Sequence, residues 1–311
     1  MRILATLLTI CTLIATTIPA SGAFSAPFVQ NQPYAGYHPS PIPASARKIR
    51  RNYSSGLNPA RPLRTPSVAA PAPNCAAVCV IDPYNGHVLY GYNASERRQV
   101  ASTQKIITAL CVCDTGDLDK LVTIQASDRL EPPIRLNLRA GEQYTRRELL
   151  QAMLTGSFND VAVSLARDCA GSVEAFVDKM NARARHMRMH NTHFANPNGL
   201  PAEQYSTAYD MALAACYAYN NRTIRSMINI PAYELRLNNG KTRTIRSTNR
   251  LLTSHPWVQG MKTGYTNLAG KCLISCAASN GRAVIVVVLG STNRKIWGES
   301  LKYLRWALDG V

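Results

Sequence analysis

Acidic side chains are missing from the whole of residues 24–74, where neither Asp nor Glu occurs. The same zone is dense in Pro, Ser and Asn, a composition that does not support a packed core. We therefore expect a disordered tether here rather than a folded domain. Its basic residues contribute +6 to the formal net charge of +17, and they are Arg47, Lys48, Arg50, Arg51, Arg61 and Arg64.

The remaining charge is also basic, because residues 75–311 retain +10 once the tether and Arg2 are subtracted. Gly-rich phosphate loops and nucleic-acid-binding modules are not apparent, so the sequence does not indicate a nucleic-acid partner. A basic tether on a basic body favours weak contact with an anionic wall polymer or a membrane surface. The alternative for the tether is a merely soluble spacer.

Long apolar runs are absent after residue 18, which leaves no transmembrane span in the mature chain. The first segment has Arg2, an apolar run over residues 3–18, and then Pro19 and the small residues that end at Ala23. This pattern predicts a secretory signal over residues 1–23 and a location outside the cytoplasm, secreted or periplasmic, on the cell-wall side of a bacterial membrane. An uncleaved membrane anchor is the alternative.

One domain of mixed elements is expected over residues 75–311. Turn signals at Asn85-Gly86 and Asn280-Gly281 each separate two β-rich runs and predict hairpins near both ends of the domain. The order of strands, helices, strands and a last helix predicts an α/β fold of the α+β type, with a helical region inserted into a sheet. Helices are expected over residues 102–113, 145–154, 160–167, 172–188, 206–219 and 294–308, the second with a Thr145–Glu148 capping box.

Three short motifs carry polar side chains into this scaffold. The first, "ASTQK", places Ser102 three residues before Lys105 at the start of an apolar helix. Alone it is explained equally well by Ser102 as a helix N-cap and Lys105 as a solvated residue. The others are the Ser-x-Asn pair of "GSFND" and the tripeptide Lys262-Thr263-Gly264 on an extended segment. The ordered set is far more specific than any member.

With this set, the chain resembles the serine penicillin-recognising enzymes, and more narrowly the low-molecular-mass D-alanyl-D-alanine carboxypeptidases of peptidase family S11. The stretches "NTHFANPNGL", "YSTAYDMA" and "KTGYTNLAGKCLISCA" share the likeness. The resemblance implies a five-stranded antiparallel sheet flanked by helices, plus an all-helical subdomain, as in β-lactamases and transpeptidases. It also implies a penicillin-sensitive serine D,D-carboxypeptidase that removes the terminal D-Ala of peptidoglycan stem peptides through an acyl-enzyme, without a cofactor.

The nucleophile is expected to be Ser102, and its base Lys105. A hydroxyl needs a base, and no His-Asp pair is spaced to serve it. One helical turn places Ser102 and Lys105 on the same face. Burial beside a second cation, Lys262, would lower the pKa of Lys105 and leave it neutral.

The other site residues take their roles from the resemblance. Ser157 relays a proton between Lys105 and the leaving amine, and Asn159 holds the substrate amide. Lys262 and Thr263 bind the terminal carboxylate. Gly264 lets the substrate lie close to the strand, and the oxyanion hole consists of the N–H groups of Ser102 and Tyr265.

Two positions depart from the family pattern. Phe158 stands where a small residue is usual, and we expect it to narrow or rim the cleft. A carboxylate-binding arginine near the start of the last helix is replaced by Ile296, which leaves Arg294 or Lys295 as substitutes.

Two other functions stay open as alternatives. A β-lactamase of the class A type needs a glutamate to activate water for deacylation, and residues 191–200 contain no acid. A catalytically silent wall-binding module would be expected to lose the motif residues, and all are present.

Cysteine is even in number once the signal is removed, which favours disulfides in an exported chain. Local pairing is excluded, because Cys272 and Cys276 lie too far apart on one strand and Cys111 and Cys113 point to different sides of one helix. We predict a bridge between Cys169 and Cys216, with free buried thiols as the alternative. His186 and His190 fall where a helix is expected to end and His193 belongs to the "NTHF" stretch, so structural or surface roles are favoured over ligation and no metal is expected.

Overall fold

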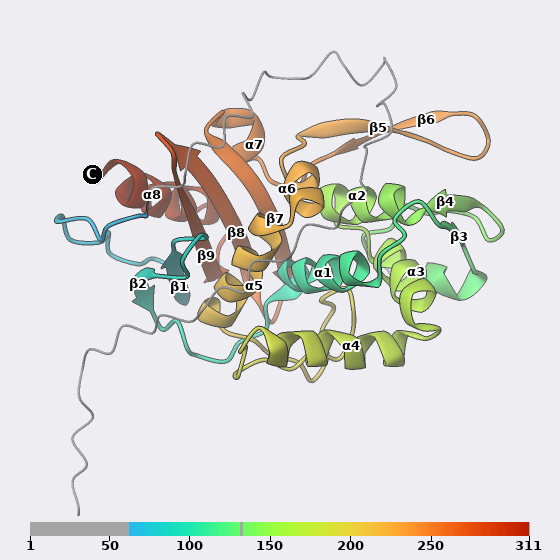
Figure 1. The fold of residues 1–311 in the computed structure, drawn as a ribbon, viewed down its shortest axis with the longest axis horizontal. Coiled ribbons are helices and arrows are strands. Elements are labelled where there is room, and N and C mark those ends of the chain that lie inside the picture. The colour runs from blue at the N-terminus through green and yellow to red at the C-terminus, as the bar shows by residue number, and fades with distance from the viewer. Residues whose placement is uncertain (1–61, 131–132, 311) are drawn as a thin grey trace, which may run out of the picture. The chain divides into compact units, whose positions relative to one another are not determined.

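The computed structural model describes residues 62–130 and 133–310. The predicted signal and the tether up to residue 61 lie outside the described residues. A five-stranded antiparallel sheet is built from both ends of the domain, which confirms the predicted fold class (Figure 1). Its strands, in the order β2-β1-β9-β8-β7, are β1 (Ala77–Ile81), β2 (Val88–Tyr92), β7 (Val258–Thr266), β8 (Gly270–Ser279) and β9 (Arg282–Ser291).

Both predicted hairpins are present. β1 pairs with β2 around a turn in which Gly86 has a φ of 73°. The tighter β8–β9 turn places Asn280 and Gly281 at φ values of 51° and 74°. Because Asn and Gly tolerate this left-handed conformation better than other residues, the dipeptide fixes the register of the two longest strands.

The two faces of the sheet are covered by different elements. Helix α8 (Ile296–Asp309) packs on one face, where Val78 and Val80 of β1 point. The opposite face, which receives Ala77, Cys79 and Ile81, carries α5 (Ala208–Asn220) and the inserted helices. This alternation is the period-two pattern of a sheet that is buried on both sides.

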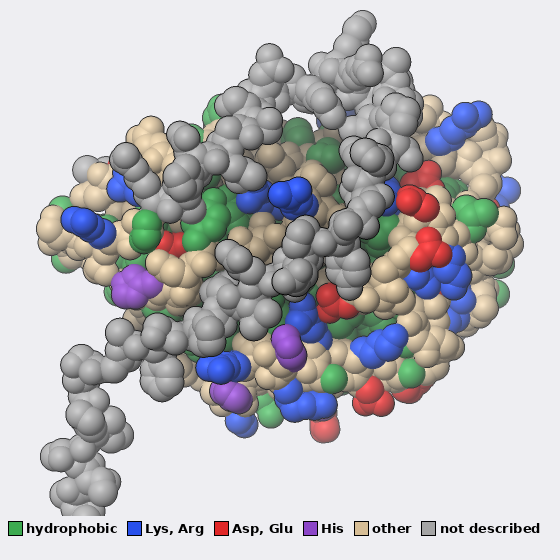
Figure 2. Space-filling model, viewed as in Figure 1, with side chains coloured by type: hydrophobic (Ala, Val, Ile, Leu, Met, Phe, Trp, Pro, Cys, Tyr) green, Lys and Arg blue, Asp and Glu red, His purple; other side chains and the backbone are tan. Residues whose placement is uncertain are grey.

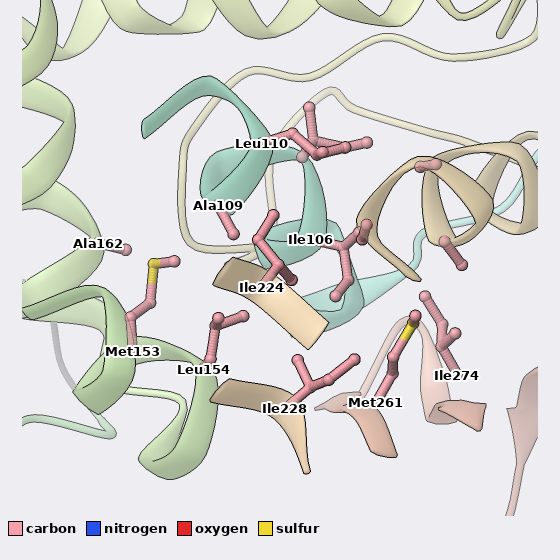
Figure 3. Packing of buried hydrophobic residues seen from close by; sticks show 14 of the residues in the cluster. Ile106, Ala109, Leu110, Met153, Leu154, Ala162, Ile224, Ile228, Met261 and Ile274 are labelled. Carbon is pink, nitrogen blue, oxygen red and sulfur yellow. The ribbon is translucent and has the colours of Figure 1, made fainter. Parts of the chain in front are cut away.

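The inserted region surrounds α1 (Lys105–Thr115), most of whose side chains are buried. Figure 3 shows Ile106, Ala109 and Leu110 of this helix pointing toward apolar side chains from the neighbouring helices and from β7 and β8. The predicted capping box at Thr145 and Glu148 is formed. The other helices of the region are α2 (Arg146–Gly156), α3 (Asn159–Ala170), α4 (Val173–His186) and α6 (Arg222–Ile228), with short α7 (Leu251–Ser254) after them.

Two small sheets lie outside the main one and were not predicted. The first pairs β3 (Leu121–Thr123) with β4 (Gln143–Thr145). The second is a hairpin of β5 (Ala232–Arg236) and β6 (Thr242–Arg246), of which Leu235 and Ile245 are buried and most other residues are exposed or half-buried. Among the residues described, no helix has the length and apolar character needed to cross a membrane.

Residues 62–74 pack on the domain, so the predicted tether is wrong over its last part. The Leu63 amide donates to the buried carboxylate of Asp82 at 2.8 Å, and the Leu63 side chain is buried. Further along, the indole of Trp306 donates to the Val68 carbonyl and the Tyr303 hydroxyl donates to the Pro71 carbonyl, both at 2.9 Å. We call residues 62–74 the N-terminal strap. This proline-rich segment has no helix or strand of its own and is held by contacts with α8 and with residues in and just after β1.

The predicted Cys169–Cys216 disulfide is also wrong, because all eight described cysteines are free. The two thiols lie in different parts of the core. Cys169 belongs to α3, which packs on α1, α2 and α4, and its carbonyl accepts a hydrogen bond from Lys179. Cys216 belongs to α5 on the sheet, with its Sγ 4.0 Å from the Asp82 carbonyl oxygen. Burial raises the pKa of both thiols, so each behaves as a small apolar side chain.

Candidate active site

Ser102 lies in a 3-10 turn (Ala101–Gln104) that leads into α1, and it is not the helix N-cap. Its neighbour Ala101 has a φ of 49°, a strained conformation for a residue other than glycine. Lys105 is fully buried, and its Nζ lies 2.9 Å from Ser102 Oγ. Lys105 is therefore not a solvated residue and lies beside Ser102, and the roles of nucleophile and base stay a prediction.

The surroundings of Lys105 favour its neutral form. Burial lowers the pKa of Lys105 well below its ordinary value, the charge of Lys262 lowers it further, and Asp160 opposes both. Its Nζ donates to Asn159 Oδ1 at 2.7 Å and to the Asn198 carbonyl. Nζ also donates to Ser102 Oγ, whose own proton goes to the Asn198 carbonyl. A neutral amine has two hydrogens and one lone pair, so neutral Lys105 can accept the Ser102 proton once that hydroxyl turns from the Asn198 carbonyl.

Asn198 was missed as a site residue by the sequence analysis. Its main-chain oxygen accepts from Lys105 and, at 3.2 Å, from Ser102 Oγ. The loop around it is tied to α1, because Thr108 Oγ1 donates to the Pro197 carbonyl at 2.7 Å. Gly199, at a φ of 85°, lies so close that a Cβ would be 2.3 Å from the Ala101 oxygen. The sequence "NPNG" predicts a turn, but it does not predict that the Asn198 carbonyl points toward Lys105.

Ser157 and Asn159 lie at the junction of α2 and α3, where Asn159 Oδ1 accepts from Lys105 and Ser157 Oγ accepts from Lys262. Ser157 ends α2 in the left-handed conformation, with a φ of 64°, and Asn159 begins α3. We expected Phe158, between them, to narrow or rim the cleft, but its side chain is nearly buried and does not form an exposed rim. Its ring is 9% exposed and lies over Gly156, where a Cβ would be only 2.2 Å from the ring.

Lys262 is the second buried lysine. Its Nζ donates to Ser157 Oγ at 2.8 Å and to the Thr263 carbonyl at 2.9 Å, and burial lowers its pKa to about 7. No ion pair joins either lysine to a carboxylate of residues 62–130 or 133–310. The hydrogen bonds recorded for the two amino groups thus go to hydroxyl, amide and carbonyl oxygens.

The rest of the motif lies on β7. Gly264 allows the strand to approach the nucleophile, because a Cβ there would be 2.9 Å from the Ser102 amide nitrogen. Tyr265 is about half exposed, with Lys271 Nζ 3.7 Å from its ring centre. Thr263 Oγ1 lies 2.6 Å from the hydroxyl oxygen of Thr248, a residue that the sequence analysis did not single out.

Other candidates lie elsewhere. Lys295 Nζ donates to Asn74 Oδ1 where the strap meets α8, and Arg294 is exposed next to it. His193 packs against Tyr205, and His186 lies beside Arg183. Within the described part of the chain, no group of three or more His, Cys, Asp or Glu is arranged to hold a metal ion.

Comparisons with known proteins give a consistent result. The family model of peptidase S11, D-alanyl-D-alanine carboxypeptidase, matches residues 65–293, which include ten residues of the strap. A D-alanyl-D-alanine carboxypeptidase of Bacillus subtilis is 36% identical over 225 residues, which are 70% of this chain but 57% of that protein. One from Streptomyces sp. K15 is 34% identical over 74% of this chain and 86% of its own length. The solved Streptomyces K15 DD-transpeptidase, 30% identical, superposes with a TM-score of 0.73 over 77% of this chain and 99% of that one.

Proposed function

Because this chain belongs to the peptidase S11 family of D-alanyl-D-alanine carboxypeptidases, we propose that it removes the terminal D-Ala from peptidoglycan stem peptides. The observation that carries the proposal is the buried Lys105, whose Nζ lies 2.9 Å from Ser102 Oγ and whose pKa is lowered. A general base of this kind is what an unactivated hydroxyl requires.

Acylation starts at Ser102. Its Oγ attacks the carbonyl carbon of the penultimate D-Ala while its proton passes to Lys105 Nζ, and the carbonyl oxygen becomes an oxyanion between the N–H groups of Ser102 and Tyr265. Collapse breaks the peptide bond. The proton reaches the departing amine through Ser157 Oγ, so free D-Ala leaves and an ester remains on Ser102. Water then attacks that ester, with Lys105 again accepting the proton, and the shortened stem is released.

Lys262 and Thr263 receive the terminal carboxylate. A carboxylate beside Lys262 favours its ammonium form, so substrate raises the pKa that burial holds at about 7. The ammonium of Lys262 in turn keeps Lys105 neutral, which links substrate binding to the protonation state of the base. Asn159 contacts both Lys105 and the position proposed for the substrate amide.

The location and the envelope partners form part of the same proposal. We place the mature chain on the outer side of a bacterial cytoplasmic membrane, with peptidoglycan stems and β-lactams as ligands. The basic residues before residue 62 would contact an anionic wall polymer or membrane surface.

The test uses the purified full chain with a stem pentapeptide ending in D-Ala-D-Ala, and separately with a labelled penicillin. We expect release of one D-Ala per stem and a long-lived penicillin adduct on the peptide that contains Ser102, both detected by mass spectrometry. Rapid turnover of the penicillin without accumulation of the adduct would indicate the β-lactamase alternative. Absence of both reactions would indicate the silent module.

A further inference from the structure

The β5–β6 hairpin and the loop of residues 133–139 carry an excess of exposed cations. Figure 2 shows Lys or Arg side chains over the far end of this hairpin, which is labelled in Figure 1. We call this set the cationic wall; its members are Arg135, Arg139, Arg236, Lys241, Arg243 and Arg246, all exposed.

The wall has few neutralising groups. Glu142 accepts hydrogen bonds from the Arg139 amide and the Tyr144 hydroxyl, and Glu234 accepts one from Thr244. No wall residue forms an ion pair with a carboxylate of the described chain. Among the described residues, these six cations and two carboxylates sum to a charge of +4.

Hydrogen bonds join the hairpin and the loop into one surface. The Gln143 amide donates to Asn238 Oδ1 at 2.9 Å, which seats the tip of the hairpin on the chain that follows the loop. Arg243 Nη1 donates to the Leu136 carbonyl at 2.5 Å, and its guanidinium lies 5.9 Å from the centre of the Phe158 ring. The two segments that carry the charges are therefore held together by hydrogen bonds.

The same surface borders both sides of the active site. On one side, the Asn159 amide donates to the Ile134 carbonyl at 2.7 Å, and the Asp160 carboxylate accepts from the Leu136 amide at 3.0 Å. On the other side, Thr248 lies two residues after the end of β6 and contacts Thr263. A chain that leaves the site between Asn159 and Thr263 thus meets the cationic wall.

We propose that the cationic wall binds the free carboxylates of an uncrosslinked peptidoglycan strand, outside the D-Ala-D-Ala end that enters the active site. The inference rests on the proposed function and specifies its substrate as the acidic polymer rather than a short peptide. Guanidinium groups match carboxylates with two parallel hydrogen bonds. Each exposed pair contributes little, but several act together, and all are screened by salt.

The test compares two substrates in the full chain. One is N,N′-diacetyl-L-Lys-D-Ala-D-Ala, which has only its terminal carboxylate; the other is uncrosslinked peptidoglycan. The variant R236Q/K241Q/R246Q changes residues of the cationic wall for which no side-chain hydrogen bond is recorded. We expect its kcat/KM on the polymer to fall about tenfold at low salt and less than threefold in about 0.5 M salt. Hydrolysis of the short peptide should stay unchanged.

The control variant R185Q/R282Q/R305Q removes the same charge from α4, β9 and α8 and should leave both substrates unaffected. An equal loss with the control, or no loss with the wall variant, would overturn the proposal while short-peptide hydrolysis still upheld the carboxypeptidase. A third outcome would also overturn the proposal: the unmodified chain binds a phosphodiester polymer of the cell envelope, and R236Q/K241Q/R246Q loses this binding but keeps its hydrolysis of peptidoglycan. The surface would then be assigned to that polymer. Absence of hydrolysis of either substrate by the unmodified chain would instead refute the carboxypeptidase.

Discussion

The two faces of the five-stranded sheet bury different kinds of side chain. Under α8 the core consists mainly of aliphatic and aromatic residues such as Leu273, Val286 and Leu304. On the opposite side the sheet and α1 enclose the amine-bearing side chains of Lys105 and Lys262 at 0% and 1% exposure. Burying an amine is unfavourable unless it is well solvated by the protein. Both faces bury apolar side chains and so stabilise the domain, but the face opposite α8 also encloses two amines, whose burial lowers their pKa values and reduces stability.

The largest expected effect is a loss of acylation without a loss of stability. Ser102→Ala should reduce acylation by penicillin at least about 10⁴-fold, because among the described residues no other hydroxyl is recorded in a hydrogen bond with Lys105 Nζ. Adduct formation is followed by mass spectrometry. The melting temperature should match that of the unmodified chain, and an adduct in this variant would remove Ser102 from its role.

Lys105→Arg should lower the acylation rate about 10³-fold, since a guanidinium stays charged and has no lone pair for the Ser102 proton. Stopped-flow acylation measures the rate. Lys105→Met is the matched control: it should be equally inactive but at least as stable as the unmodified chain, because a buried amine has been removed. Near-normal acylation in Lys105→Arg would show that the base lies elsewhere.

Leu304→Ala tests the contribution of the α8 face of the sheet to stability. Leu304 is fully buried under α8, so the cavity should reduce the free energy of unfolding by about 3 kcal/mol. Urea unfolding gives this value. Titration with penicillin should show an unchanged acylation rate per folded molecule; a slower rate would mean that the two faces are not separate in function.

The pH dependence of stability distinguishes the faces more finely. Lys262 has a folded pKa of about 7 against an ordinary value of 10.5, so between these pH values the unfolded chain binds the extra proton and stability rises with pH. Relative to Lys262→Met, the unmodified chain should gain about 2 kcal/mol between pH 7 and pH 9. Parallel curves for the two proteins would contradict the lowered pKa. The comparison with a variant is needed because buried thiols such as Cys79, with a pKa raised to about 12, lower stability at high pH in both proteins.

Thr248→Val should have the smallest effect. Its hydroxyl lies 2.6 Å from that of Thr263 and orients it, so we expect KM for a D-Ala-D-Ala peptide to rise about three- to fivefold with kcat nearly unchanged. Steady-state kinetics measure both constants. Thr248→Ser should restore KM, and a fall in kcat alone would contradict a role in carboxylate binding.

The sequence predicted those parts of the site that depend on local spacing. Ser102 and Lys105 are one turn apart, and the Asn280-Gly281 turn sets the register of β8 and β9, so both follow from a few adjacent residues. Asn198 and Thr248 could not be found this way. Each enters the site through a main-chain carbonyl or a hydroxyl whose direction depends on packing between segments far apart in the chain.

Composition was also a poor guide where tertiary contacts replace internal structure. The N-terminal strap has the proline content of a tether, yet Leu63 is buried and held by Asp82. Cys169 and Cys216 were paired because both lie in the helical region, although one packs among helices and the other against the sheet. The exposed β5–β6 hairpin has a weak apolar pattern, with Leu235 and Ile245 as its buried members, and was not predicted.

The strap determines where a recombinant fragment of this protein should begin. A fragment that starts at residue 75 would delete the acceptors of the Trp306 indole and the Tyr303 hydroxyl, two aromatic side chains that are themselves buried. Each hydrogen bond contributes about 0.5–1.5 kcal/mol net, and deletion of the strap would also expose apolar surface of the domain to water, so we expect the shorter fragment to be less stable. A fragment that begins at residue 62 keeps these bonds, and the domain as an expressible unit is therefore longer at its N-terminal end than its composition indicates.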